Sequence, residues 1–280
     1  MMIFINIIIG LLIGILSILC GFSNNLLNFW IMFEIIYLSV IPLIMYDSNY
    51  YSLNKILGNF IIVQIISGSM IFYCLINSNF VNLFFIFLIF KLGGLWFCFF
   101  LINLYNNLSW MNIFFFGVLT KLFFLFLNNF NNINFIEILI IFSFFFNTII
   151  LFNLNFNLKS FYCLISISSS LLGIYFSVNL NNNFLYIWII NYILIQFFVL
   201  YGLNLLHENN INNLNSFFVI LFCLSLPCSL NIFYKIISIY YLFYISNINF
   251  LIIYWILSSV ELLYFIKILY GYIYNYNNLI

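Results

Sequence analysis

The chain has 280 residues, of which 67% are apolar and only 4% are charged, with a formal net charge of +1. A soluble domain carries about 25% charged residues, so this composition excludes a water-facing surface. No stretch between the apolar runs is long enough to build a core of its own. We therefore expect a single transmembrane domain over residues 1–280, with no soluble domain.

The amino acids that are missing point to the genome of origin. The chain contains no Ala, no Arg and only 2 Pro, while Phe, Ile, Leu, Tyr and Asn are abundant. The depleted residues are those with GC-rich codons, which is typical of an AT-rich organellar genome. The opening segment MMIFINIIIGLLIGILSILCGF lacks the charged region and cleavage site of a signal peptide, so we interpret it as the first membrane span.

Breaks rich in Asn and Ser divide the chain into about ten apolar spans. We predict these spans near residues 2–22, 27–46, 56–76, 80–102, 110–127, 135–152, 160–178, 184–206, 217–245 and 250–274. The ninth is too long for one straight crossing and contains Pro227, which removes a backbone donor and breaks a helix. A separate span in lipid can satisfy the hydrogen bonds of its backbone N–H and C=O groups only as a helix. The predicted fold class is therefore an all-α polytopic membrane protein with a discontinuous helix near Pro227.

Six of the eleven formal charges lie near the ends of spans. Four charges lie in or beside the polar breaks: Asp47, Lys55, Lys159 and Glu208. His207 lies next to Glu208, and we interpret all five side chains as solvated loop groups. Glu137 is in the first turn of the sixth span, where a carboxylate favours the positive end of the helix dipole. Lys267 is close enough to the polar tail to extend its ammonium to the interface.

The other five charges lie inside the spans: Glu34, Lys91, Lys121, Lys235 and Glu261. An ionisable group at mid-membrane costs about 2.5–3.5 kcal/mol on insertion scales and is by default a functional-site hypothesis. The simpler interpretation is a set of static ion pairs that hold helices together. Three lysines and two carboxylates on five different spans pair off poorly, however, and the pattern favours a proton relay.

Burial supplies the chemistry that such a relay needs. Desolvation disfavours a charged lysine and a nearby carboxylate favours it, so a buried lysine beside an acid can take up or release a proton. Arg cannot do this, because it does not deprotonate in proteins. The polar segments SISSS at Ser166–Ser170 and QIISGS at Gln64–Ser69 are candidate linings, although Ser and Gly also pack helices closely.

Redox cofactors are not expected on this chain. A single His cannot supply the axial ligands of two haems or of a haem–copper centre. The six cysteines show no C-x-x-C spacing and are interpreted as small buried hydrophobes. No phosphate-binding loop or dinucleotide fingerprint is present in the sequence.

Three ordered segments resemble the family of subunit 2 of mitochondrial NADH dehydrogenase, which belongs to respiratory complex I. WIMFEIIYLSVIPL (Trp30–Leu43) is similar to the family's W-I-G-x-E-x-x-x-L-S-x-I-P-L. KLGGLWFCFFLINLYNNLSWMNIFFFGVLTKLFFLFL (Lys91–Leu127) resembles its K-L-G-x-x-P-F-H-x-W, G-L-S-W-x-N and T-W-Q-K. SLPCSLNIFYK (Ser225–Lys235) is similar to its G-L-P-P-x-x-G-F-x-x-K.

The resemblance implies a proton-translocating subunit with an antiporter-like helix bundle, in the mitochondrial inner membrane. Electron transfer from NADH to ubiquinone drives such a subunit, and NADH, FMN, the iron–sulfur clusters and ubiquinone bind to other subunits of the complex. The implied partners are the other membrane-arm subunits, including neighbouring antiporter-like subunits, and membrane lipids, with no nucleic acid. The chain would then be part of a translocase without carrying a redox centre itself.

The resemblance also assigns roles to four residues. Glu34 falls on the family's glutamate, Lys91 on the lysine of the first broken helix, Lys121 on the central lysine and Lys235 on the terminal one. Lys91 is then the proton-carrying partner of Glu34. Glu261 has no counterpart in the family, and we interpret it as a candidate partner or exit group for Lys235.

The first motif departs from the family pattern at two positions. The family's Pro and His are replaced by Trp96 and Cys98, so a titratable group is lost. The helix break expected after Lys91 would then depend on Gly93–Gly94.

Other departures leave alternatives open. T-W-Q-K keeps only its lysine, a family His in the seventh helix is replaced by apolar residues near Leu171–Leu172, and the chain ends where the family continues into another helix, which indicates a shortened copy. One alternative is a structural scaffold in the same complex, without a proton path of its own. Others are a different organelle-encoded respiratory subunit or a free-standing cation/proton antiporter, although the proton channel of ATP synthase needs an Arg that is missing here.

Overall fold

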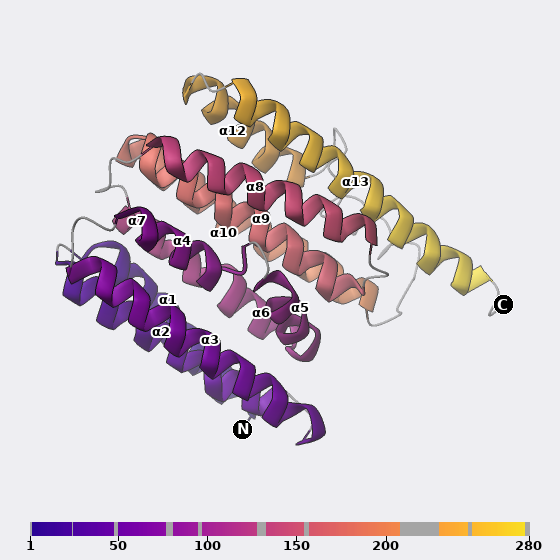
Figure 1. Ribbon diagram of the computed structural model, residues 1–280. Helices are drawn as coiled ribbons and strands as arrows, with labels where there is room; N and C mark the ends of the chain where they lie inside the picture. The colour runs from indigo at the N-terminus through magenta and orange to yellow at the C-terminus, as the bar shows by residue number, and fades with distance from the viewer. Residues whose placement is uncertain are drawn as a thin grey trace.

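The computed structural model describes residues 2–23, 25–47, 50–76, 81–94, 97–127, 133–153, 157–207, 230–245 and 248–277. All the regular structure in these segments is helical, and none of the described residues forms a strand. The predicted all-α fold class is therefore confirmed. The helices lie side by side with their axes roughly parallel (Figure 1). The chain progresses from its amino-terminal helices at one side of the bundle to its last helices at the other.

The helices follow the predicted apolar spans. In chain order they are α1 (Met2–Gly21), α2 (Leu26–Asp47), α3 (Tyr50–Ile76), α4 (Val81–Lys91), α5 (Cys98–Asn107), α6 (Trp110–Gly117), the 3-10 helix η3 (Leu119–Phe123), α7 (Phe124–Leu127), α8 (Ile133–Asn153), α9 (Leu158–Asn179), α10 (Asn182–His207), α12 (Leu230–Ile245) and α13 (Ile248–Asn277). Most predicted bounds agree with these to within a few residues. One exception is α3, which begins at Tyr50, because polar residues near its start extend the helix beyond its apolar part. Another is α5, which continues to Asn107, beyond the predicted end at 102. The first part of the ninth predicted span, 217–229, lies outside the described residues.

Several of these helices have the length and composition of membrane spans. Within the described residues, six segments are long and apolar enough to cross a membrane: Leu26–Asp47, Ile56–Ile76, Trp110–Leu127, Leu158–Asn179, Asn182–Leu205 and Ile248–Lys267. Shorter apolar helices accompany them at Asn6–Gly21, Asn82–Lys91, Phe135–Leu151 and Asn231–Ile245. The chain thus has the character of a multi-pass membrane protein.

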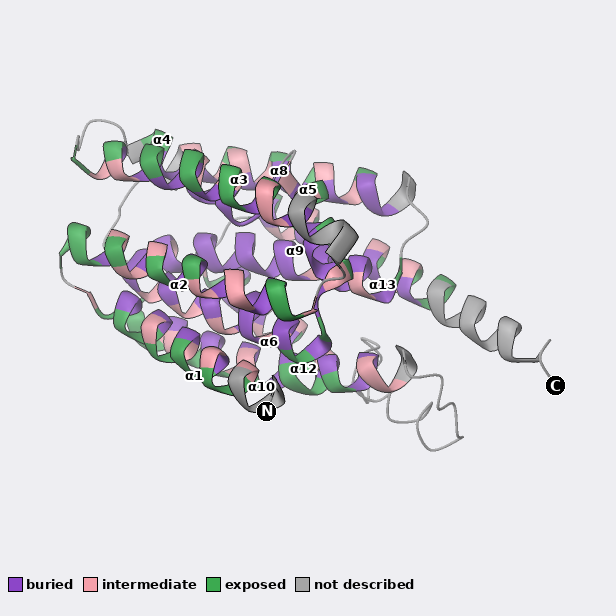
Figure 2. Cartoon of the chain, turned by 90° about the horizontal axis from the view of Figure 1, so that it is seen from below, coloured by how far each residue is buried: buried purple, intermediate pink, exposed green. Residues whose placement is uncertain are grey.

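Helix α9 lies at the centre of the bundle. It contacts α5, α7, α8, α10 and α13, and 94% of its span is buried, against 33 to 39% for the spans of α2, α3, α10 and α13. Figure 2 shows buried residues along α9, while the outer helices carry exposed residues on their outward faces. The serine run Ser166–Ser170 is part of α9, so its hydroxyl groups are enclosed in the protein interior.

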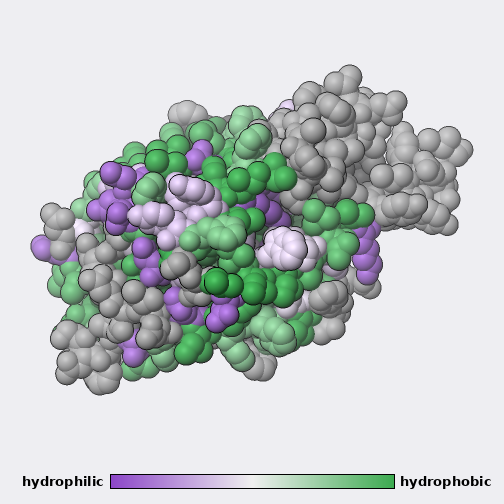
Figure 3. Space-filling model, turned by 90° about the horizontal axis from the view of Figure 1, so that it is seen from above, coloured by the Kyte–Doolittle hydropathy of each residue, from purple (hydrophilic) through white to green (hydrophobic). Residues whose placement is uncertain are grey.

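Large apolar side chains form much of the outer surface. Ile, Leu, Phe and Tyr residues are exposed on α1, α3, α8, α10 and α13. Hydrophobic residues cover much of the described surface in Figure 3, with hydrophilic residues in smaller groups. Contiguous apolar surface of this kind marks contact with lipid or with other proteins. The polarity is therefore inverted relative to a soluble protein, with ionisable groups inside and hydrocarbon outside.

Helix α4 ends just after Lys91 in a Schellman motif. The Gly94 N–H donates to the Ile89 carbonyl at 2.8 Å, and the Gly93 N–H donates to the Phe90 carbonyl at 2.9 Å, which satisfies the carbonyls of the helix end. Gly93 has a φ of +80°, a conformation that residues with a Cβ rarely adopt. The predicted break at Gly93–Gly94 is therefore present, and it places Lys91 at the end of a half-helix.

A second break, which the sequence did not indicate, lies within the span Trp110–Leu127. Helix α6 ends at Gly117, and the 3-10 helix η3 separates it from α7. The Thr120 hydroxyl donates to the Phe116 carbonyl at 2.6 Å, a side-chain bond that competes with the α-helical ladder. Lys121 lies at the middle of the 3-10 stretch. The other predicted break, at Pro227, lies outside the described residues.

Candidate functional site

Glu34 and Lys91 form a buried ion pair between α2 and α4. The Lys91 Nζ lies 2.6 Å from the Glu34 Oε1, within the range of a charge-assisted hydrogen bond. The lysine side chain is fully buried and the glutamate side chain is 21% exposed. The rings of Phe33 and Tyr37 lie beside the ammonium, with centroids 4.4 and 4.5 Å from Nζ, and add cation–π attraction. The predicted contact between these two charges is therefore present.

Helix α3 shapes the space around the Glu34 carboxylate. A Cβ at Gly68 would lie 2.5 Å from the Glu34 Oε1, so only a glycine leaves room for the carboxylate in this position. The Trp30 indole N–H donates to the Gly68 carbonyl at 3.0 Å and holds α2 against this part of α3. The segment Gln64–Ser69, predicted as a lining, thus contributes mainly through the closeness of its backbone.

Lys121 is buried among neutral hydrogen-bond acceptors. Its Nζ donates to the Ser166 carbonyl at 2.5 Å, to the Ser169 hydroxyl at 2.7 Å and to the Tyr192 hydroxyl at 2.7 Å. The residue is 6% exposed, and among the described residues no carboxylate pairs with it. The three acceptors satisfy the three N–H donors of an ammonium group. They stabilise the charge through dipoles, without neutralising it.

A small cavity lies between Lys91 and Lys121. It has a volume of about 20 Å³, and its lining includes both lysines together with Tyr105 and Ser166. A water needs about 10–15 Å³ of such space and at least two polar partners. The cavity therefore has room for one water within reach of both lysines. The Ser166 hydroxyl donates to the Tyr105 hydroxyl at 3.1 Å, so the lining already contains a hydrogen-bonded pair.

Lys235 and Glu261 form a second ion pair, between α12 and α13. The Lys235 Nζ lies 3.5 Å from the Glu261 Oε2 and 3.3 Å from the Ser258 carbonyl, to which it donates. The other carboxylate oxygen, Oε1, accepts from the Ser168 hydroxyl at 2.9 Å. The side chains of Lys235 and Glu261 are 14% and 9% exposed. Glu261 is therefore the partner of Lys235, as we predicted, and it also contacts α9.

The serine run of α9 reaches both lysine sites. Ser166 and Ser169, three residues apart, lie on one face of the helix and accept from the Lys121 ammonium, Ser166 through its backbone carbonyl and Ser169 through its hydroxyl. Ser168 lies on another face and contacts Glu261. One buried helix thus carries hydroxyl groups toward Lys121 on one side and toward the Lys235–Glu261 pair on the other.

Asp47 and Lys159 bind the two ends of one peptide group. The Asp47 Oδ2 accepts from the Ser109 N–H at 2.7 Å, and the Lys159 Nζ donates to the Leu108 carbonyl at 2.6 Å, which belongs to the same peptide bond. The Asn112 side chain also donates to Asp47, at 2.6 Å. Both charges lie partly exposed at helix ends, as predicted, and in addition they hold the turn between α5 and α6. Only the long-range fold brings them together, and no local sequence signal indicates it.

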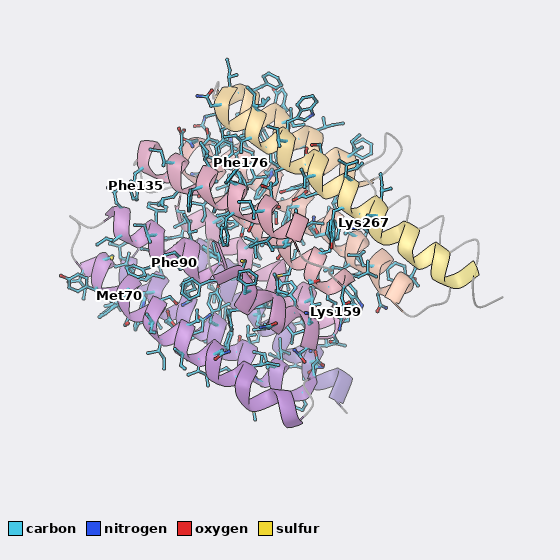
Figure 4. The ribbon with its side chains drawn as sticks, turned by 45° about the vertical axis from the view of Figure 1, so that its right-hand side comes forward. Met70, Phe90, Phe135, Lys159, Phe176 and Lys267 are labelled. Carbon is cyan, nitrogen blue, oxygen red and sulfur yellow. The ribbon has the colours of Figure 1, made fainter. Side chains whose placement is uncertain are left out.

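The remaining predictions have mixed outcomes. Glu137 accepts from the Tyr175 hydroxyl at 3.4 Å, and Lys267 is exposed near the ring of Tyr264. Figure 4 shows Lys159 and Lys267 toward the same end of the bundle, away from Phe135. Four cysteines are buried and free: Cys20, Cys74, Cys98 and Cys163. The predictions for Trp96, Glu208, Cys223 and Cys228 fall outside the described residues, as does the side chain of His207.

Comparison with known proteins does not assign a family. No protein-family model matches the chain, and no curated protein matches it significantly. The resemblance to subunit 2 of mitochondrial NADH dehydrogenase therefore stays a prediction from three sequence motifs. The buried charges of the described structure are the observations that bear on function.

Proposed function

We propose that this chain is a proton-translocating, antiporter-like membrane subunit of respiratory complex I in the mitochondrial inner membrane. In this proposal about ten transmembrane helices form an antiporter-like bundle, and Glu34, Lys91, Lys121 and Lys235 carry protons. Quinone reduction elsewhere in the complex drives the transfer, and other subunits bind NADH, FMN, the iron–sulfur clusters and ubiquinone. Neighbouring antiporter-like subunits and lipids cover the apolar exterior.

The observation that carries the proposal is the environment of Lys121. A buried ammonium with only neutral partners is expensive to keep charged, and a protein that needed only packing at this place would carry an apolar residue. A lysine–carboxylate pair accompanies it on each side, Glu34 and Lys91 across the small cavity, Lys235 and Glu261 across α9. This alternation of paired and unpaired lysines favours a relay over a set of static ion pairs.

The partners of Lys121 suit both protonation states of the amine. The hydroxyls of Ser169 and Tyr192 accept from the ammonium, and each can turn to donate its own proton to a neutral amine. The two hydroxyls are also 3.1 Å apart, so one can accept from the other. When Lys121 loses a proton, the hydroxyls of Ser169 and Tyr192 therefore keep hydrogen-bond partners.

Lys121→Met tests the proposal, because Met keeps the length and the apolar stem of lysine but cannot hold a proton. The complex that contains the chain is purified and reconstituted, and NADH-driven quinone reduction and proton uptake are compared with wild type. Lys267→Met is the matched control, because Lys267 is exposed. We expect both activities to fall in Lys121→Met, with the complex still assembled, and to persist in Lys267→Met.

The opposite result would favour a scaffold. Leu171 and Leu172 are buried in the middle of α9, where the family that the chain resembles has a titratable His. This replacement is the observation that favours a scaffold. If Lys121→Met assembles and retains full quinone reduction and proton uptake, the chain supports its neighbours and protons cross elsewhere.

A further inference from the structure

Glu261 divides its two carboxylate oxygens between Lys235 and α9. Oε2 faces the Lys235 ammonium at 3.5 Å, and Oε1 accepts from the Ser168 hydroxyl at 2.9 Å. The first distance exceeds the 2.7–2.9 Å that is usual for a charge-assisted hydrogen bond, and it also exceeds the 2.6 Å between Lys91 and Glu34. The Lys235–Glu261 pair is therefore held less tightly than the Glu34–Lys91 pair, although both are enclosed by the bundle.

The Ser168 hydroxyl suits both protonation states of this carboxylate. It lies 2.9 Å from the Glu261 Oε1 and also 2.9 Å from the Ile165 carbonyl, but it has only one proton to donate. With Glu261 ionised, the hydroxyl proton points to the carboxylate. With Glu261 protonated at Oε2, Oε1 stays a carbonyl acceptor, and the Ser168 hydroxyl donates either to it or to the Ile165 carbonyl. No buried polar group loses its partner in either state.

A cavity beside the pair has room for water. It has a volume of about 30 Å³, and its lining includes Gln196, Asn231, Lys235 and Glu261. This volume exceeds the 10–15 Å³ that one water occupies, and the four side chains offer both donors and acceptors. The Gln196 carbonyl oxygen also accepts from the Tyr162 hydroxyl of α9 at 3.0 Å. A water that enters this cavity therefore lies beside the carboxylate, where it can accept a proton and pass it on.

From these contacts we infer that Glu261 is a fifth proton-exchanging residue, which takes a proton from Lys235 and delivers it to water in this cavity. The inference rests on the proposed function and extends it to a residue for which the resembling family has no counterpart. In the first step an N–H bond of Lys235 breaks, its electron pair stays on nitrogen, and an O–H bond forms at the Glu261 Oε2. One cation and one anion become two neutral groups, and the net charge of the pair is unchanged.

The second step restores the carboxylate. The O–H bond of Glu261 breaks, its electron pair stays on oxygen, and the proton passes to the cavity water as hydronium. Lys235 is left as a neutral amine, ready to accept the next proton from the Lys121 side of α9. The carboxylate therefore separates the lysine relay from the water through which the proton leaves.

Glu261→Gln tests this role, because glutamine keeps the shape and hydrogen bonds of the acid but takes up no proton. Glu137→Gln is the matched control, since Glu137 is a carboxylate on α8 that accepts from Tyr175. A positioned acid or base accelerates proton transfer by about 10²–10⁴-fold. We expect NADH-driven proton uptake by the reconstituted complex to fall about tenfold or more in Glu261→Gln, to stay unchanged in Glu137→Gln, and to recover in part in Glu261→Asp.

A second measurement separates proton exchange from loss of assembly. Infrared difference spectra between resting and turning-over complex report the carbonyl band of a protonated carboxyl group. We expect a band in wild type that is absent in Glu261→Gln and present in Glu137→Gln. Identical bands and identical proton uptake in wild type and Glu261→Gln would overturn the inference.

Lys121→Met, measured in the same preparation, separates this inference from the proposed function. If Lys121→Met loses proton uptake while Glu261→Gln keeps it, Glu261 is only the static partner of Lys235 and the relay itself stands. If both variants keep full uptake, the inference and the proposed function fail together.

Discussion

The Lys91 ammonium on α4 lies 2.6 Å from the Glu34 carboxylate on α2, although 57 positions separate the two residues in the chain. Removing one partner of a buried pair leaves an uncompensated charge and costs about 3–5 kcal/mol. Glu34 is 21% exposed, so solvent screens part of this cost. The fully buried lysine is the member of the pair that depends more on its partner.

We therefore predict that Glu34→Gln destabilises the purified complex by about 3 kcal/mol, at the lower end of that range. The double variant Glu34→Gln/Lys91→Met should recover much of the loss, because no charge then stays buried. Thermal denaturation of the subunit within the complex measures both effects. Additive losses in the double variant would contradict the prediction, since they would mean that the two charges act independently.

Gly68→Ala should displace the Glu34 carboxylate without changing any charge. The added Cβ would lie 2.5 Å from the Glu34 Oε1, closer than real Cβ contacts come, so the carboxylate must shift from the position in which it meets Lys91. Gly58→Ala on the same helix is the matched control, because a Cβ there meets nothing within 4 Å. We expect lower proton uptake and lower thermal stability in Gly68→Ala only, with Gly58→Ala neutral or stabilising by about 0.5–1 kcal/mol.

The Leu108–Ser109 peptide depends on charges from two distant helices. Asp47→Asn weakens the acceptor of the Ser109 N–H, and Lys159→Met leaves the Leu108 carbonyl without its charged donor. The loss at the part-buried Leu108 carbonyl should cost about 1–3 kcal/mol, and the loss at the exposed Ser109 amide should cost less, about 0.5–1.5 kcal/mol. Hydrogen exchange of the Ser109 amide should be faster in Asp47→Asn than in wild type. Lys267→Met, which removes an exposed lysine, should leave that exchange rate unchanged.

Lysine residues gather at one end of the bundle. Lys159 lies in the first turn of α9 and Lys267 lies toward the same end on α13 (Figure 4). Lys55 lies in the second turn of α3, and α3 starts close to the end of α2, where Asp47 lies. Asp47 and Lys159 bind the same peptide group, so Lys55 is at this end of the bundle too. Glu137 lies near the start of α8, at the opposite end. Lysine bias close to helix ends sets the orientation of a membrane protein, and acidic residues contribute little.

We predict that the lysine end faces the compartment in which the chain is synthesised, and single cysteines test this. Asn157 and Asn181 are exposed and flank the two ends of α9. A membrane-impermeant thiol reagent should label Asn157→Cys from the side of synthesis and Asn181→Cys from the other side, against the parent chain as a background. The reverse labelling pattern would show the opposite orientation.

The apolar pattern predicts most helix bounds, because runs of hydrocarbon between Asn-rich breaks leave few alternatives for the backbone in lipid. The break after Lys91 is also accessible from sequence, because Gly93 adopts a φ of +80° that other residues disfavour. The break at Lys121 is not. It depends on the Thr120 side chain and on the close approach of Gly117 to Tyr105, and neither interrupts the run of apolar letters.

The sequence also predicts only part of the candidate site. A charge inside a hydrocarbon segment is conspicuous, so the amino-acid sequence alone singles out Glu34, Lys91, Lys121, Lys235 and Glu261. The neutral hydrogen-bond partners of these five residues cannot be identified from the sequence. The acceptors of Lys121, the contact of Ser168 with Glu261 and the contacts of Asp47 join residues 45 to 93 positions apart. Tertiary packing alone creates these contacts.

The 3-10 stretch around Lys121 also has a mechanical consequence. Its five residues span about 10 Å at the 3-10 rise of 2.0 Å per residue, but about 7.5 Å at the α-helical rise of 1.5 Å. A change from one form to the other would shorten the segment by about 2.5 Å, and Lys121, at its middle, would shift by about half of this relative to either end. The length of this 3-10 turn therefore sets where the Lys121 ammonium lies relative to its hydroxyl acceptors on α9 and α10.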